Sequence, residues 1–277
     1  MPTDAHVFPE ARAVLGHLLA GLDARAPGLV TGAYLTGSIA LGDGRPGQSD
    51  IDLVLARAEG VDNAETMAIL VPALAELRRA HPRPVLDGIV LNAADLTAGP
   101  DAIAGARPVI FDSEATLEDG GSARNPVTWA TLRQCGLAWR GKLDRDRLWH
   151  DPARLDAWTR ENLERYWRPW LARTERLAAR PDLPDLIDEA TEWGVLGVTR
   201  LHATLATGGI VSKRGAGTYA LETFPERWHP IVRTAIRLRE RLPDDHDQSP
   251  YRRCHDMRAY VAMVIADALA LPERHDP

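Results

Sequence analysis

The segment TGSIALGDGRPGQSDIDLVL, residues 36–55, decides the fold of the first half of this chain. A short apolar run at residues 32–35 precedes it, and residues 50–55 alternate and then become apolar, which predicts two neighbouring strands joined by a polar loop. Side chains alternate across a strand, so Asp50 and Asp52 are expected on one face. The glycine of the Gly37-Ser38 turn lets backbone amides approach a bound group closely, as a phosphate site requires.

The pair Asp50 and Asp52 indicates a bound cation. Two like charges held close together repel, and burying them unpaired costs several kcal/mol or more. Mg²⁺ prefers oxygen ligands and often uses one or two carboxylates together with the phosphates of a substrate. The segment therefore predicts a site for a nucleoside triphosphate with Mg²⁺. An Asp-x-Asp pair also occurs at solvated strand edges, and a Gly-Ser pair in ordinary turns, so the prediction depends on their combination.

A third carboxylate, Asp87, lies in the otherwise apolar run of residues 84–91, which predicts a buried strand containing one charge. A charge in the middle of such a strand is expected to serve the same site. The alternative is a half-exposed strand with Asp87 facing water.

These motifs carry a resemblance. Gly37-Ser38, Asp50-x-Asp52 and the distant Asp87 resemble the nucleotidyltransferase superfamily built on the polymerase-β type core. Within it the chain resembles the aminoglycoside O-nucleotidyltransferases of the streptomycin/spectinomycin adenylyltransferase type. Residues 199–201, 207–208, 210 and 212–213 resemble the C-terminal helical domain of that family. The resemblance implies an α+β fold: a nucleotidyltransferase domain at residues 1–152, with a small mixed sheet and helices, and a helical bundle at residues 153–277 that closes over substrate and nucleotide.

The resemblance also implies an enzyme that transfers a nucleoside monophosphate, AMP from ATP, to a hydroxyl of a small polar acceptor such as an aminoglycoside antibiotic. Two Mg²⁺ ions are expected as cofactors. Asp87 would bind the second ion or accept the proton of the hydroxyl; the family usually has glutamate there, which puts the reach of this shorter side chain in question. The implied residues are, for catalysis and metal, Asp50, Asp52 and Asp87, and for the nucleotide, Gly37, Ser38, Ser49, Arg200 and Lys213.

Lys213 stands out without the resemblance. Of the 33 basic residues only Lys142 and Lys213 are lysines. A lysine and an arginine are not interchangeable at a phosphate site, so a lysine kept among so many arginines is a candidate for chemistry. For Lys142, survival by chance is an equally good interpretation. For Arg200, an ordinary salt bridge is the alternative.

A polycationic acceptor calls for carboxylates and aromatic rings. The tryptophan on which the resembled family stacks its acceptor corresponds to a position near Asp112, and the later carboxylate that binds the acceptor corresponds to a position near Ala190. This sequence therefore matches the acceptor residues of the family poorly. Candidates for the acceptor site are Asp112, Glu114, Asp188, Glu189, Glu192 and Trp193.

Composition limits the alternatives. The 277 residues allow two domains, and the contents of 45% hydrophobic and 26% charged residues are typical of a globular protein. A net charge of −6 argues against a nucleic-acid acceptor. No apolar stretch is long enough for a membrane span, and the N-terminus lacks a signal sequence, so we expect a cytoplasmic protein with no membrane partner. We expect it to be a monomer. Cys135 and Cys254 are predicted to be free buried thiols.

Hydrophobic periodicity predicts the remaining elements. In the first half we expect a strand at residues 108–111 and helices at 8–25, 62–81 and 128–140, with Asp62-Asn63 capping the helix that runs to about residue 81. In the second half we expect helices at 153–179, bent or interrupted at Pro169, and at 186–207, 212–221, 230–242 and 251–271, with Ser212 as the cap of the helix at 212–221. Two rival functions stay open: the same chemistry on another metabolite or on a protein, and a non-catalytic, antitoxin-like relative that keeps the fold.

Overall fold

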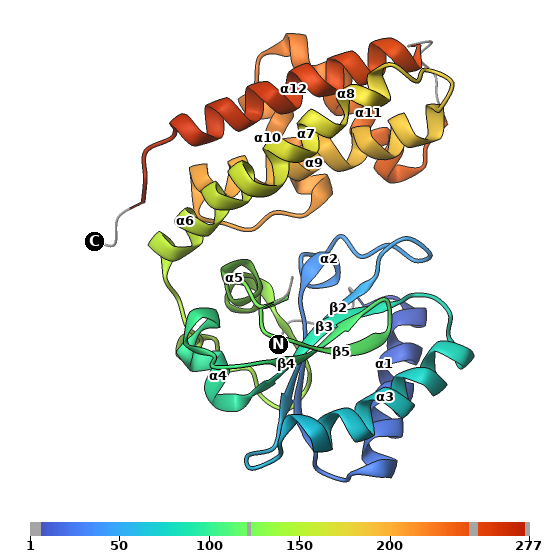
Figure 1. Cartoon of the computed structure of the whole chain (residues 1–277), viewed down its shortest axis with the longest axis vertical. Coiled ribbons are helices and arrows are strands. Elements are labelled where there is room, and N and C mark those ends of the chain that lie inside the picture. Colours follow the sequence, from blue (N-terminus) through green and yellow to red (C-terminus); the bar gives the residue numbers. More distant parts are fainter. Residues whose placement is uncertain (1–6, 121–122, 244–248, 275–277) are drawn as a thin grey trace. The chain divides into compact units, whose positions relative to one another are not determined.

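The computed structural model describes residues 7–120, 123–243 and 249–274. The chain divides into two compact units, Met1–His150 and Asp151–Pro277. The first unit contains a mixed six-stranded sheet with helices on it, and the second is helical throughout its described residues (Figure 1). This is the α+β architecture that the sequence predicts.

The sheet of the first unit has the strand order β5-β4-β3-β2-β1-β6. Only β2 and β3 run parallel; every other neighbouring pair is antiparallel. The strands are β1 (Val30–Leu35), β2 (Ile51–Arg57), β3 (Leu86–Asn92), β4 (Arg107–Phe111), β5 (Glu114–Glu118) and β6 (Leu137–Arg140).

Helices cover both faces of this sheet. On one face α1 (Pro9–Arg25) and α3 (Asn63–Ala80) lie side by side (Figure 1), and their leucines pack on Leu53 and Leu55 of β2. On the other face the alternate residues Val54 and Ala56 join the core that contains Trp129 of α5 (Pro126–Cys135). Asp52 has the same parity as Val54, so its side chain projects on the α5 face.

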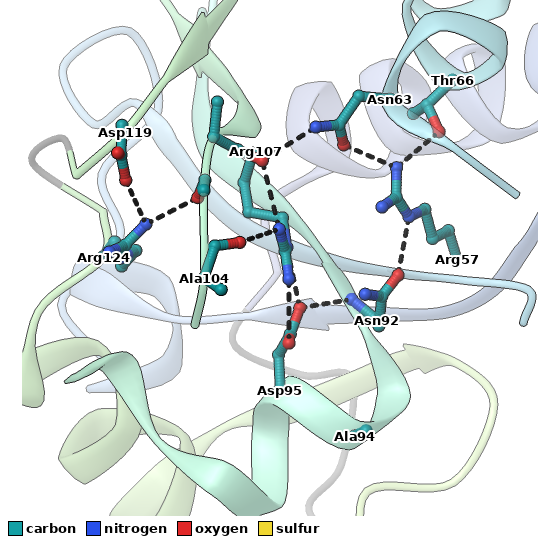
Figure 2. A network of polar contacts seen from close by, with 12 residues as sticks. Arg57, Asn63, Thr66, Asn92, Ala94, Asp95, Ala104, Arg107, Asp119 and Arg124 are labelled. Atoms are coloured by element: carbon teal, nitrogen blue, oxygen red, sulfur yellow. Dashed lines mark hydrogen bonds and ion pairs between the residues drawn. The ribbon is translucent and has the colours of Figure 1, made fainter. Parts of the chain in front are cut away.

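A polar network holds the carboxyl ends of the two parallel strands together (Figure 2). The buried guanidinium of Arg57, at the end of β2, donates to Asn92 of β3 at 2.8 Å and to Asn63 and Thr66 of α3 at 2.9 and 3.0 Å. Arg57 and Asn92 are also register partners. Because the side-chain period of a strand is two, this anchor also sets which residues face each other at the opposite ends of β2 and β3.

The first unit differs from the sequence prediction in its shortest elements. The predicted helix at residues 128–140 ends at Cys135, and the next residues form the edge strand β6 beside β1. Strand β5 and the helices α2 (Gly37–Ala40) and α4 (Ala93–Ala98) were not predicted. Each is six residues or fewer, too short to show a clear period. The predicted cap of α3 is confirmed, since Asp62 accepts from the Glu65 N–H at 2.8 Å.

The second unit is built from seven α-helices within its described residues. The predicted helix at 153–179 is interrupted, one of the two outcomes expected near Pro169, by a π-helical turn at Leu163–Trp167. The ring nitrogen of Pro169 cannot donate the usual helical hydrogen bond. The helices are α6 (Pro152–Asn162), α7 (Arg168–Arg173), α8 (Glu175–Ala178), α9 (Pro184–Thr207), α10 (Lys213–Thr223), α11 (His229–Glu240) and α12 (Pro250–Ala270).

Helix α9 forms the centre of this bundle and packs against α10, α11 and α12. At Gly194 and Gly197 an added methyl group would overlap the rings of Trp170 and Trp167. These two glycines therefore let the indoles pack against α9, which confirms that Trp167 belongs to the core. The cap that Ser212 provides to α10 is confirmed as well, because its hydroxyl accepts from the Gly215 N–H at 3.0 Å.

Both cysteines are free, as predicted; Cys254 is buried, whereas Cys135 is only half-buried. None of the helices in the described part of the chain has the length and apolarity that a bilayer span requires.

Candidate active site

Two of the predicted carboxylates lie side by side at the start of the parallel strands. Asp52 of β2 and Asp87 of β3 are register partners. Paired residues of neighbouring strands face the same side of a sheet, and the strands lie about 4.8 Å apart. The register anchored by Arg57 thus brings together two acidic side chains that are far apart in sequence.

The Gly37 turn lies directly against Asp52. The backbone N–H of Thr36 donates to the Asp52 carbonyl at 2.9 Å, and Gly37 has a φ of +56°. A methyl group at Gly37 would overlap the Asp52 carboxylate, and even the Cβ atom of Asp52 would be only 2.9 Å from it. Glycine at position 37 therefore meets two requirements, the left-handed backbone and the close approach of a carboxylate.

Asp50 lies one residue before β2, so the predicted strand begins slightly later than expected. Its Oδ1 atom is 3.4 Å from Nη1 of Arg83, and the Asp50 side chain is 44% exposed. Arg83 was not among the predicted site residues, and no sequence motif distinguishes it. This exposed ion pair contributes at most about 1 kcal/mol, so it leaves Asp50 able to change partners.

Asp87 is half-buried on β3. Burial is the largest influence and raises the pKa of Asp87; a 2.8 Å hydrogen bond from the Asp112 N–H opposes this rise, and the negative charges of Asp50 and Asp112 add to it. Asp112 begins the tight turn between β4 and β5, with a φ of +49°. The turn thus fixes Oδ1 of Asp87, and a raised pKa makes its carboxylate a stronger base.

The carboxylates fit a metal site of two protein ligands better than one of three. Within residues 7–120, 123–243 and 249–274 no group of three or more carboxylate, histidine or cysteine side chains is gathered to hold a metal ion. Asp50, Asp52 and Asp87 are therefore not arranged in advance around one ion. Asp50 is paired with Arg83, and Asp87 accepts a hydrogen bond from the Asp112 N–H. Mg²⁺ commonly takes one or two carboxylates and completes its shell with water and phosphate. Asp50 and Asp52 match that donor set.

The loop between β1 and β2 is closed by its own hydrogen bonds. The Asp43 N–H donates to the Ser38 carbonyl at 2.8 Å, and the Arg45 N–H donates to the Ser49 hydroxyl at 3.0 Å. Ser49 is buried, so its first role is to brace this loop. Its hydroxyl hydrogen remains available to donate to a phosphate oxygen.

The predicted cations Arg200 and Lys213 lie in the second unit. Nε of Arg200, on α9, donates to the Val211 carbonyl at 3.1 Å. Nζ of Lys213, the first residue of α10, is 2.9 Å from Oε1 of Glu192 and lies 5.1 Å from the centre of the Trp193 ring. Burial lowers the pKa of Lys213; the charge and hydrogen bond of Glu192 raise it, and Arg239 and Arg200 lower it further. The exposed side chain of Lys142 shows no such environment.

The predicted acceptor residues are divided between the two units: Asp112 and Glu114 lie in the first, and Asp188, Glu189, Glu192 and Trp193 lie in the second. Asp188 is paired with the buried Arg253, and Glu192 is the counter-ion of Lys213. Trp193 stacks on Trp167 and is 43% exposed. These two carboxylates therefore have basic partners within their own unit, an arrangement that residue spacing did not reveal. Of the remaining candidates, Asp112 and Glu114 belong to the β4–β5 hairpin and Glu189 is exposed on α9.

Phe111, the last residue of β4, was missed by the sequence analysis. Its side chain is 66% exposed, and it directly precedes Asp112, whose N–H holds Asp87. An exposed aromatic ring beside acidic side chains suits a cationic ligand. The only sequence signal was an aromatic residue next to the position at which the resembled family stacks its acceptor.

Comparison with known proteins agrees with this fold. The family model described as "Nucleotidyltransferase domain" matches residues 17–85, and the one described as "Aminoglycoside adenylyltransferase, C-terminal domain" matches residues 172–266. A crystal structure of the spectinomycin adenyltransferase AAD(9) from Enterococcus faecialis with ATP and spectinomycin has the same fold. It is 13% identical, with a TM-score of 0.57 over 91% of this chain and 99% of that chain. A search of curated proteins found no match.

Proposed function

We propose, from the premise that this chain is a nucleotidyltransferase of the aminoglycoside adenylyltransferase type, that it transfers AMP from ATP to a hydroxyl of an aminoglycoside or aminocyclitol antibiotic in a Mg²⁺-dependent reaction. The observation that supports this most strongly is the placement of Asp52, in register with Asp87 and against the Gly37 turn. One face of the sheet would thereby combine a metal ligand, a base and a phosphate-binding turn.

Asp50 and Asp52 would hold Mg²⁺, which when bound neutralises oxygens of the triphosphate and orients its α-phosphate. The turn at Gly37 and Ser38, together with the Ser49 hydroxyl, would hold phosphate oxygens. The backbone at Gly37 serves this role because no side chain separates it from the ligand. Lys213 and Arg200 would stabilise the negative charge that develops on the leaving pyrophosphate.

Asp87 would accept the proton of the acceptor hydroxyl. The hydroxyl oxygen forms a bond to the α-phosphorus, the bond from that phosphorus to the oxygen bridging to the β-phosphate breaks, and pyrophosphate leaves. Because the Asp112 N–H holds Oδ1 of Asp87, Oδ2 is the atom that we assign to the proton. We prefer this role to second-metal binding, since burial raises the pKa of Asp87 and the Asp112 N–H holds one of its two carboxylate oxygens.

An aminoglycoside is a polycation, and the exposed ring of Phe111 beside Asp112 offers it a π face and a negative charge. We place the acceptor on this hairpin rather than on Asp188 or Glu192, because both of these carboxylates are paired with basic side chains.

The test is to incubate the full chain with Mg²⁺, ATP and a panel of aminoglycosides and aminocyclitols, including streptomycin and spectinomycin, and to identify products by mass spectrometry. We expect one compound to gain the mass of one AMP group, with release of pyrophosphate. Parallel reactions with GTP, CTP and UTP establish the donor. Transfer to protein but to no small molecule would refute the antibiotic assignment, and no turnover with any acceptor would favour a non-catalytic relative.

A further inference from the structure

The buried face of α11 ends in a charged residue, Arg239. Ile231, Val232 and Ala235 of this helix are buried in the bundle core. Arg239 follows Ala235 by four residues, about one helical turn, so it continues the same face toward α9. Its side chain is 13% exposed.

Arg239 is poorly satisfied for an arginine at that depth. Its nearest counter-ion is Oε1 of Glu192, 3.6 Å from Nη1, which is beyond hydrogen-bond range. Its Nε atom is buried and has no hydrogen-bond partner in the part of the chain that the structure describes. Arg57 provides a contrast, since that buried guanidinium makes three hydrogen bonds of 3.0 Å or less. Buried polar atoms are nearly always paired, so the open Nε of Arg239 calls for an explanation.

Positive charge exceeds negative charge around this arginine. A single carboxylate oxygen, Oε1 of Glu192, serves both Nζ of Lys213 and Nη1 of Arg239. Arg239 and Arg200 lie close enough to Lys213 to influence its pKa. One carboxylate on α9 is thus shared by a cation on α10 and a cation on α11, and these three helices pack together. An anion with several oxygens would satisfy these donors better than Glu192 does.

We propose that Lys213 and Arg239 form one polyphosphate-binding site in which Glu192 is the resident anion, and that the phosphate chain of the nucleoside triphosphate replaces Glu192 as their partner. This inference rests on the proposed function and adds to it a third cation, Arg239. It also changes the expected role of Glu192 from contact with the acceptor to competition with the donor. Arg239 consequently strengthens the binding of the phosphate chain, whereas Glu192 weakens it.

The experiment measures binding of inorganic tripolyphosphate, and of ATP with Mg²⁺, to the full chain by titration calorimetry. Arg239→Met is compared with Arg233→Met, which removes the same charge from an exposed position of the same helix. We expect Arg239→Met to raise Kd roughly 10- to 100-fold, as expected for losing charged hydrogen bonds, and Arg233→Met to change it less than about twofold. Arg239→Lys, which keeps the charge, should retain part of the affinity.

The second variant is Glu192→Gln, which removes the competing charge but keeps a similar shape. We expect it to bind tripolyphosphate roughly 2- to 5-fold more tightly, an effect of the size found for partly exposed charge pairs. If the ion pair of Arg239 and Glu192 had only a structural role, Arg239→Met and Glu192→Gln would both bind tripolyphosphate more weakly and melt at a lower temperature. Weaker or unchanged binding by Glu192→Gln would therefore overturn the proposal even if Arg239→Met fails to fold.

The outcomes separate this inference from the proposed function. A wild-type chain that binds ATP while Arg239→Met and Arg233→Met behave alike would refute the role of Arg239 and leave the nucleotidyltransferase activity standing. A wild-type chain that binds neither tripolyphosphate nor ATP would refute both.

Discussion

Replacement of Gly37 by alanine separates the geometry of the site from the stability of the fold. At a φ of +56° an alanine costs roughly 1–2 kcal/mol relative to glycine. For a chain of this size 1 kcal/mol corresponds to a fall in melting temperature of about 2–4 °C, so we expect a loss of about 2–8 °C. The new methyl group would also overlap the Asp52 carboxylate, which must rotate away from its position.

The expected effect on activity is much larger than the effect on stability. Displacing a catalytic group by about 1 Å costs on the order of 100-fold in rate, so kcat/KM of Gly37→Ala should fall by at least that factor. Gly60→Ala is the matched control, because Gly60 has a φ of +81° and nothing lies within 4 Å of an added methyl group. It should lose similar stability and keep its activity.

The assay is AMP transfer to the acceptor identified by the panel, at saturating Mg²⁺ and at a temperature well below both melting transitions. If Gly37→Ala and Gly60→Ala have activities within about threefold of each other, the close approach of Asp52 to the turn has no catalytic role. The reasoning about the turn would then be wrong.

Two further predictions concern Asp87. The Asp87→Asn variant should lose turnover but melt at a higher temperature at pH 7–8. A buried carboxyl with a raised pKa destabilises the fold as pH rises through that pKa, because it must then carry a charge. The asparagine side chain is uncharged, and its oxygen can still accept from the Asp112 N–H. Thermal melts should show no such gain below pH 3.8, and a lower melting temperature at pH 8 would contradict the reasoning. The Asp112→Asn variant keeps the backbone N–H but removes a charge that raises the pKa of Asp87. The acidic limb of its plot of kcat/KM against pH should therefore move to lower pH. An acidic limb that stays in place or moves to higher pH would show that Asp87 is not the base.

Strong local signals made the first strand pair and the cap of α3 predictable. The apolar runs around Gly37 and Asp52 have the period of strands, and Asp62 precedes a long helical stripe. The register of Asp52 with Asp87 was not predictable in the same way, because it depends on how two distant strands align. The structure reveals the anchor of that alignment, the bond from Arg57 to Asn92.

The partners of the charged groups were beyond sequence reasoning. Tertiary packing alone brings Arg83 to Asp50, the Asp112 N–H to Asp87, and Arg239 to Glu192. Strand β6 was missed because Leu137–Arg140 directly follows a helix without a long polar break. The residue types at the candidate site were therefore visible in the sequence, whereas the partner of each charge was not.

The Mg²⁺ dependence of turnover in the Asp52→Asn variant tests the central assignment most directly. We expect the wild-type rate to rise to saturation with Mg²⁺. We expect Asp52→Asn to lose orders of magnitude in turnover and to melt within a few degrees of the wild type, because one ligand charge is removed from a folded chain. Normal turnover of Asp52→Asn with an unchanged Mg²⁺ dependence would contradict the metal site at Asp50 and Asp52.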